Sequence, residues 1–461
     1  PTRKTPYAGT THIFIASHRL MMTRNFYLDH NLKRKQTNMK PSIALDQSII
    51  LTQHDEIVNM LLELTAPPAP AVDRAPLDIA LVIDRSGSMQ GEPMAAVRQA
   101  VTELIRVAGP ADRIAVVAFD SHIETVLPLA HHNVDNVRQH IANVHSRGST
   151  NLSGGWLKGC EILSTASAVP GRAPAIKRIV VLTDGHANSG IQNPDELATM
   201  TRGGIASGIT TSMIGFADGY DETLLASMAD SGGGNDYWCA GPDQALNVFN
   251  QEFDGLASVV AQNLSVEIRP TDATATFEVL NEYDAVDLPA VLGAQQVLIG
   301  DACGDEVRRL LVRFTLRPRL LPGTFTIANL TLRWASTVGS IALHEVALPV
   351  VLNASDNQAD IQEIDPFVTR EVLLLQVAKV RKAAIKAARR GDIAEARILF
   401  NQAINVLTTI GADPREIEEL VDLANRLEQF TERDMKAQYS MLRSTNKGRG
   451  KRFDPNDPFS H

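Results

Sequence analysis

The stretch LDIALVIDRSGS at residues 77–88 decides the fold of the central part of the chain. Its first seven residues form an almost continuous apolar run, which is typical of a strand buried on both faces of a parallel sheet. Asp84, Ser86 and Ser88 follow directly, and the carboxyl end of such a strand is where open α/β sheets bind ligands. The stretch therefore predicts an α/β domain with a polar loop at its ligand edge.

The same alternation of apolar strand and helical run extends over residues 76–258. Further strand-like runs are separated for the most part by helical runs, and they lie at 113–119, 177–183 and 210–216, with a hairpin partner near 122–127 and an edge strand at 235–240. Strands that alternate with helices form parallel sheets covered by helices on both faces. We therefore predict the fold class α/β for 76–258, as a doubly wound, mostly parallel, Rossmann-like sheet.

From about residue 262 the apolar residues recur with a period of two, as in Leu264, Val266 and Ile268. Several such runs, separated by turn residues, predict a flanking antiparallel β-sandwich over 259–355. A strand with the same period at 57–65 precedes a Pro-rich linker and has no partner nearby in the sequence. We expect the segment 41–75 to pair with this later sheet.

The remaining segments differ from these in composition. Residues 356–442 repeat apolar side chains at helical spacing, which predicts a C-terminal helical domain packed as a bundle. The first segment, 1–40, is basic and has no periodicity, so its composition differs from that of the rest of the chain. We expect it to be disordered. The last, 443–461, is polar and rich in charge, and we expect a disordered tail.

Charge and cysteine content exclude several classes of function. The chain carries a net charge of −9, and since residues 1–40 hold eight Lys/Arg and one Asp (+7), the remainder carries −16. This acidic body argues against nucleic-acid and anionic-membrane partners. The three cysteines have no disulfide or metal-ligand spacing, and no apolar run approaches the roughly 20 residues of a membrane span. With no signal-peptide pattern at the first residues, these features favour a cytoplasmic location.

Two further loops belong to the same sheet edge as Asp84. The loop RGSTNLSGG (147–155) presents Thr150 before a helical run, and LTDGHANSG (182–190) presents Asp184 directly after a buried strand. Carboxyl ends of parallel strands meet at one edge, so five side chains are expected to converge there, namely Asp84, Ser86, Ser88, Thr150 and Asp184. The alternative is that these residues only cap helices and tighten turns.

All five side chains offer oxygen, which selects a hard cation: Mg²⁺ first, with Mn²⁺ or Ca²⁺ as alternatives. Two are charged and three are neutral hydroxyls, so a bound ion keeps waters that an acidic side chain of a partner can displace. Arg85 lies inside the first loop, and we interpret it as a solvated surface arginine rather than a group that attracts an acidic ligand.

The three loops in this order, D-x-S-x-S, G-x-T-N and T-D-G, resemble the metal-ion-dependent adhesion site of the von Willebrand factor type A (VWA) domain. The resemblance covers about 77–258 and matches all five positions. It implies that Asp84, Ser86, Ser88 and Thr150 bind the metal directly or through water, and that Asp184 often does so through water. The whole layout is similar to bacterial proteins that resemble the inter-alpha-trypsin inhibitor heavy chain.

These observations predict a non-enzymatic module in which Mg²⁺ accepts an Asp or Glu side chain from a protein partner. One alternative is a Mg²⁺-dependent phosphohydrolase with Asp84 as phosphoryl acceptor, although Ser86 occupies the place of the second carboxylate that such enzymes use. Another is a scaffold for an ATPase or kinase partner, in which the metal is secondary. The partner and the oligomeric state stay open, and we assign no catalytic residue.

Overall fold

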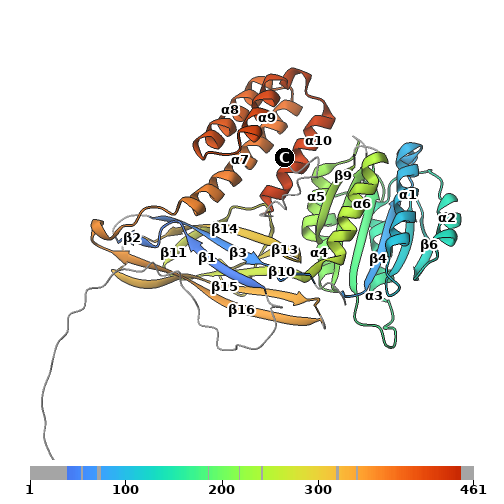
Figure 1. The fold of residues 1–461 in the computed structure, drawn as a ribbon, viewed down its shortest axis with the longest axis horizontal. Coiled ribbons are helices and arrows are strands. Elements are labelled where there is room, and N and C mark those ends of the chain that lie inside the picture. Colours follow the sequence, from blue (N-terminus) through green and yellow to red (C-terminus); the bar gives the residue numbers. More distant parts are fainter. Residues whose placement is uncertain are drawn as a thin grey trace, which may run out of the picture. The chain divides into compact units, whose positions relative to one another are not determined.

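The computed structural model describes residues 39–52, 56–69, 74–184, 186–216, 219–239, 242–317, 321–338 and 341–447. The expectations of disorder for 1–38 and 448–461 lie outside the described residues. All described residues belong to one compact unit, in which an α/β part, a two-sheet β part and a helical part are distinguished by their elements (Figure 1). The fold class predicted from the sequence is confirmed.

The α/β part is a six-stranded sheet in the order β6-β5-β4-β7-β8-β9. Neighbouring strands are parallel except for the antiparallel β5–β6 hairpin. The strands are β4 (Leu77–Asp84), β5 (Arg113–Phe119), β6 (Ile123–Ala130), β7 (Ile176–Thr183), β8 (Ile209–Phe216) and β9 (Gly233–Cys239). The helices are α1 (Glu92–Val107), α2 (Val134–Ala142), α3 (Leu152–Ser164), α4 (Pro194–Ile205), α5 (Glu222–Ser231) and α6 (Pro242–Ala257), with a 3₁₀ turn at Gly87–Met89.

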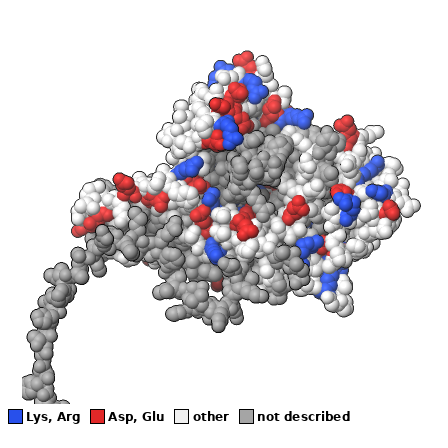
Figure 2. Space-filling view, viewed as in Figure 1, with Lys and Arg blue, Asp and Glu red and all other residues white. Residues whose placement is uncertain are grey.

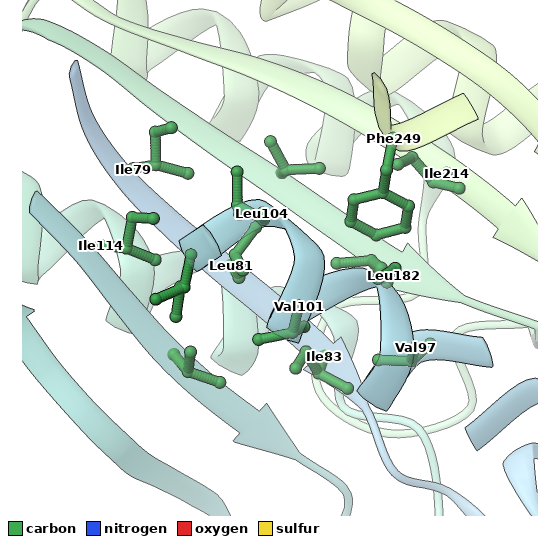
Figure 3. Packing of buried hydrophobic residues seen from close by; sticks show 14 of the residues in the cluster. Ile79, Leu81, Ile83, Val97, Val101, Leu104, Ile114, Leu182, Ile214 and Phe249 are labelled. Carbon is green, nitrogen blue, oxygen red and sulfur yellow. The ribbon is translucent and has the colours of Figure 1, made fainter. Parts of the chain in front are cut away.

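Strand β4 is buried along its whole length because helices cover both faces of the sheet. Its alternate residues enter two separate cores. Ile79, Leu81 and Ile83 face one core together with residues of α1, α2 and α6, while Ala80 and Val82 face the other with residues of α3, α4 and α5. Figure 3 shows the first core, in which Val97, Val101 and Leu104 of α1 lie over β4, and Phe249 of α6 lies beside Ile214 of β8. This packing fixes the end of β4 and thereby the position of the polar loop that begins at Asp84.

The β part is a sandwich of a four-stranded sheet, β1-β3-β14-β11, and a six-stranded sheet, β12-β13-β10-β15-β16-β2, around one apolar core. All pairs are antiparallel except β2 with β16. The strands are β1 (Lys40–Leu45), β2 (Ile49–Leu51), β3 (Ile57–Thr65), β10 (Val259–Pro270), β11 (Thr274–Val279), β12 (Asp284–Asp287), β13 (Gln295–Cys303), β14 (Val307–Leu316), β15 (Gly323–Ser336) and β16 (Ala342–Ser355).

Strand β3 pairs with β14 across a separation of about 250 residues along the chain, from Ile57 opposite Thr315 to Thr65 opposite Val307. On its other side it pairs with β1. The sequence pattern singled out β3 and not β1 or β2. Lys40, which the sequence assigned to a disordered segment, begins β1. These two strands have six and three residues, too few for a clear period.

Four helices form the C-terminal part: α7 (Pro366–Arg389), α8 (Ile393–Thr409), α9 (Pro414–Asn425) and α10 (Glu432–Asn446), with short 3₁₀ helices at Gln358–Asp360 and Leu427–Gln429. The disordered tail predicted from residue 443 is wrong for its first residues, because α10 continues to Asn446. Arg443 is buried there and donates to the carboxylates of Asp230 and Asp236 at 2.7 and 2.5 Å. Polar composition misled the prediction, since these charges are paired rather than solvated.

One buried ion pair joins the α/β sheet to the sandwich. The guanidinium of Arg178 on β7 donates to Asp301 on β13 at 2.6 Å, and both side chains are less than one tenth exposed. This pair favours the observed placement of β7 against β13, because either charge would be costly to bury without the other. Among the described residues, no helix has the length and apolar character that crossing a membrane requires.

Candidate metal centre

The carboxylate of Asp84 is fixed at the end of β4. It is fully buried, and its Oδ1 accepts a hydrogen bond from the backbone N–H of Ser86 at 2.7 Å. Its Oδ2 accepts from the hydroxyl of Thr183, the last residue of the adjacent strand β7, at 2.6 Å. Since one bond comes from its own loop and one from the next strand, the carboxylate is held at the junction of the first and third loops.

A chain of hydroxyls continues from this carboxylate to the third loop. Ser86 Oγ lies 3.1 Å from Ser88 Oγ, and the Ser88 hydroxyl donates to Asp184 Oδ1 at 2.8 Å. Ser86 and Asp184 are buried, whereas Ser88 is exposed. Four of the five residues predicted from the sequence therefore form one hydrogen-bonded cluster that reaches the surface at Ser88.

Thr150 is joined to the third loop through its backbone. Its N–H donates to Asn188 Oδ1 at 2.7 Å, and its carbonyl accepts from the N–H groups of Asn188 and Ser189 at 3.2 Å each. The preceding Gly148 carbonyl accepts from Gly87 N–H at 3.3 Å, so the second loop contacts both of the others. The Thr150 side chain is buried at this junction, and within the described part of the chain it makes no hydrogen bond to the other four.

Two glycines give the loops their shape. Gly148 has φ +72°, and a Cβ there would lie 2.9 Å from Ser121 Oγ. Gly190, also at φ +72°, would place a Cβ 2.3 Å from Oδ1 of Asn151, the residue that caps α3. Both positions therefore require glycine, for conformation and for space.

The carboxylates of Asp84 and Asp184 give the cluster a negative charge that no nearby cationic side chain among the described residues compensates. Burial raises the pKa of Asp84 to about 6, against the opposing bonds from Thr183 and Ser86, and the nearby charge of Asp184 adds to the increase. Burial likewise raises the pKa of Asp184, although Ser88 donates to it. Neither carboxylate forms an ion pair with an Arg, Lys or His among the described residues. A buried carboxylate without a cationic partner is costly unless a cation is supplied.

The interpretation of Arg85 as a solvated surface residue is wrong. Arg85 is only 4% exposed; its Nε donates to Asp120 Oδ2 at 3.1 Å and its Nη1 to Glu124 Oε2 at 2.6 Å. Its side chain thus turns away from Asp84 and toward the β5–β6 hairpin. The motif loop is enclosed on that side, which a loop position in the sequence does not reveal.

Asp120 is the residue of this edge that the sequence reasoning missed. It directly follows β5 as Asp84 ends β4, and its carboxylate accepts from Arg85, from Arg147 Nε at 2.9 Å and from His122 N–H at 2.6 Å. Its carbonyl accepts from Asn151 N–H at 3.2 Å. Although burial acts to raise the pKa of Asp120, the His122 N–H and the two arginines hold it below its ordinary value. Asp120 therefore ties the first and second loops to the hairpin.

The donor set fits a hard divalent cation. It consists of carboxylate and hydroxyl oxygens, which suit Mg²⁺, an ion that keeps waters where the protein supplies few ligands. No group of three or more His, Cys, Asp or Glu side chains gathers as a metal site in the described ranges. The cluster has two carboxylates, so any cation it holds must rely on the hydroxyls as well.

An open, mostly parallel sheet with helices on both faces and an oxygen-donor cluster at its carboxyl edge is a Rossmann-like α/β fold. The model of the von Willebrand factor type A domain family matches residues 78–258, and this part of the chain is a VWA domain. The resemblance to the VWA domain seen in the sequence is thereby confirmed.

Known proteins extend the similarity beyond this domain. An uncharacterized protein of Synechocystis is 26% identical over 329 residues, 69% of this chain and 76% of that protein. Inter-alpha-trypsin inhibitor heavy chain H3 of Rattus norvegicus is 30% identical over 161 residues, 33% of this chain but only 18% of its own length. The solved structure of a von Willebrand factor type A protein from Catenulispora acidiphila has a TM-score of 0.71 at 17% identity, covering 92% of this chain and 99% of that one, and so shares the fold.

Proposed function

We propose that Asp84, Ser86, Ser88, Thr150 and Asp184 hold a Mg²⁺ ion and that the domain uses it to bind an acidic side chain of a protein partner. The observation that carries this proposal is the pair of buried carboxylates, Asp84 and Asp184, which have hydroxyl and N–H donors but no cationic partner among the described residues. A divalent cation compensates that charge.

The residues of this chain set the properties of the site. Thr183 and the Ser86 N–H orient the Asp84 carboxylate, and the Ser88 hydroxyl bridges toward Asp184. With two anionic and three neutral donors, a divalent ion would retain positive charge and water-filled coordination positions that a carboxylate oxygen can take. Ser88 is exposed, which supports an opening that a protein partner can reach.

The same geometry favours binding over catalysis. A phosphohydrolase of the kind considered above needs a second carboxylate two residues after Asp84, and Ser86 occupies that position with its hydroxyl directed to Ser88. The VWA family commonly mediates metal-dependent protein interactions, and the relatives reported above carry no enzyme name. We therefore place no catalytic residue in the cluster. The cytoplasmic location expected from the sequence stays a prediction.

Metal binding is tested by thermal unfolding of the full chain with EDTA and with Mg²⁺. The wild-type chain is expected to melt at a higher temperature with Mg²⁺. At a hundredfold excess of Mg²⁺ over Kd, the free energy of unfolding rises by about 2.7 kcal/mol. Asp84→Asn is expected to lose the increase, whereas Glu161→Gln, an exposed carboxylate on α3 paired with Lys158, is expected to keep it. An equal Mg²⁺ response in wild type and Asp84→Asn would contradict the proposed site.

The partner is tested by affinity capture from a lysate of the source organism, with the wild-type, Asp84→Asn and Glu161→Gln chains side by side. A specific partner should be retained by the wild type and Glu161→Gln in Mg²⁺, released by EDTA, and not retained by Asp84→Asn. Substitution of one Asp or Glu in that partner should then abolish retention. If capture survives both EDTA and Asp84→Asn, the metal does not form the bridge.

A further inference from the structure

A second polar site lies between helices α1 and α2, away from the three loops of the metal centre. It is a surface cleft of about 440 Å³. One wall is a face of α1 with Arg98, Gln99, Thr102 and Glu103, and the other belongs to α2 with Arg138 and Ile141. Figure 2 shows basic and acidic side chains interspersed over the region that Figure 1 labels α1 and α2. No residue of this cleft belongs to the Asp84 cluster, so the two sites are separate.

Arg98 has hydrogen-bonding capacity that the described residues leave unused. Its Nη2 donates to the carbonyl of Val144 at 2.6 Å, which holds the guanidinium beside the end of α2. Its Nε is buried and has no hydrogen-bond partner. An unsatisfied buried donor on a charged group is costly, so the residues around this guanidinium satisfy it only in part.

The charged residues that line the cleft are Arg98, Arg138 and Glu103, so the cleft carries a net positive charge. Both carboxylate oxygens of Glu103 accept from Arg106, one turn along α1, so this carboxylate is directed to Arg106 and forms no ion pair with Arg98 or Arg138 among the described residues. Arg138 on the opposite wall is 64% exposed and has only a 3.7 Å contact with Asp135, which is itself 90% exposed. Such an exposed pair contributes little. Arg98 and Arg138 therefore present two available guanidinium groups from two helices.

We propose that this cleft binds an oxyanionic group, a carboxylate or a phosphate, between Arg98 and Arg138. A planar guanidinium recognises either group through paired N–H donors, and two guanidiniums on facing helices can engage both oxygens of one ligand. Binding there adds a site of opposite electrostatic character to the metal centre: one site accepts a cation and the other an anion.

Calorimetric titration of the full chain, freed of metal on a chelating resin and kept in chelator-free buffer, tests the proposal, with glutarate as the carboxylate probe and pyrophosphate as the phosphate probe. We expect saturable binding of at least one probe. Because each lost charge-assisted bond weakens binding about tenfold or more, Arg138→Gln and Arg98→Gln are expected to raise Kd by at least that factor. Arg138→Gln is the safer variant, since Arg98 also supports the contact to Val144.

Two further variants separate this site from general charge effects. Arg397→Gln removes an exposed arginine of α8, loosely paired with Glu428, and should leave Kd unchanged. Glu103→Gln removes the acidic wall and frees Arg106, so it should tighten binding. Asp84→Asn should not weaken it. The proposal is overturned if neither probe binds, if Arg98→Gln and Arg138→Gln bind like the wild type, or if Glu103→Gln weakens binding.

Discussion

Two pairs of buried carboxylates, one at each end of the VWA sheet, lie in opposite electrostatic surroundings. At the amino end, Asp78 accepts from Arg113 at 2.9 and 2.5 Å and from Arg172 at 2.7 Å. Asp112 there accepts from Arg74 at 2.9 and 2.6 Å. Burial acts to raise the pKa of each, but these arginine bonds outweigh it and hold the pKa below its ordinary value. At the carboxyl end, burial prevails and the pKa values of Asp84 and Asp184 are raised.

The difference is between charge that arginines neutralise inside the fold and charge that stays uncompensated, as the proposed metal site requires. A carboxylate paired with arginine inside the fold is already satisfied and has nothing to offer a cation. Asp84 and Asp184 are equally enclosed, yet their donors are hydroxyls and N–H groups, which orient the oxygens without cancelling their charge. The uncompensated charge thus lies at the edge where parallel sheets bind ligands.

The largest effect on stability is expected from removing the carboxylate of Asp78, which is paired with arginines at the amino end of the sheet. Asp78 is buried, and Asp78→Asn leaves the partly buried Arg113 and Arg172 without their counter-charge; removing one partner of a buried ion pair costs about 3 kcal/mol or more. For a domain of this size that corresponds to a fall in Tm of roughly 6–12 °C. Scanning calorimetry in EDTA measures it. A change of less than about 2 °C would mean that the arginines do not depend on this carboxylate.

The matched substitution at the other end should act with the opposite sign. In EDTA near pH 7.5, Asp84→Asn removes a buried charge whose pKa is raised from 3.8 to about 6, a difference equivalent to about 3 kcal/mol at 1.36 kcal/mol per unit. The variant should therefore melt at or above the wild-type temperature while losing the Mg²⁺ response. A drop as large as that of Asp78→Asn would erase the distinction between the two ends.

The pH dependence of stability sharpens the same contrast. Because the folded-state pKa of Asp84 is raised, its neutral form is favoured in the fold, so the metal-free chain should lose stability as pH rises from about 4 to about 6. Asp78, whose folded-state pKa is lowered, contributes stability above pH 4 that is lost as pH falls below it. Denaturant titrations of wild type and Asp84→Asn in EDTA should differ between pH 4 and 6. Coincident profiles would remove Asp84 as the source.

Much of this domain could be predicted from the sequence because its determinants are local. The apolar run ending in Asp84 indicates a doubly buried strand, and the same logic places Thr150 and Asp184 at one edge. The hydrogen bonds that join Ser86, Ser88 and Asp184 follow from that placement. Position along a buried parallel strand therefore carries the information about this site.

The features that escaped prediction depend on partners far away in the chain. Arg85 is buried because Asp120 and Glu124, 35 and 39 residues later, face it. Arg443 is ordered by Asp230 and Asp236, more than 200 residues earlier. A charged residue looks the same in the sequence whether it is solvated or paired. No local pattern distinguishes the two, and for that reason the expectations for both residues failed.

Substitution of Asp120 tests whether position at the sheet edge or pairing with arginine determines how a buried carboxylate affects stability. Its effect on stability is expected to be the smallest of those proposed. It lies at the carboxyl end like Asp84, yet it is paired with Arg85 and Arg147 like Asp78. If pairing governs stability, Asp120→Asn should lower it in EDTA, by about 1–2 kcal/mol, since Glu124 still pairs with Arg85 and Arg147 is 63% exposed. Calorimetry beside Asp84→Asn and the exposed control Glu161→Gln measures this. An Asp120→Asn variant as stable as Asp84→Asn would show that position at the sheet edge, rather than the arginine pairing, separates these carboxylates.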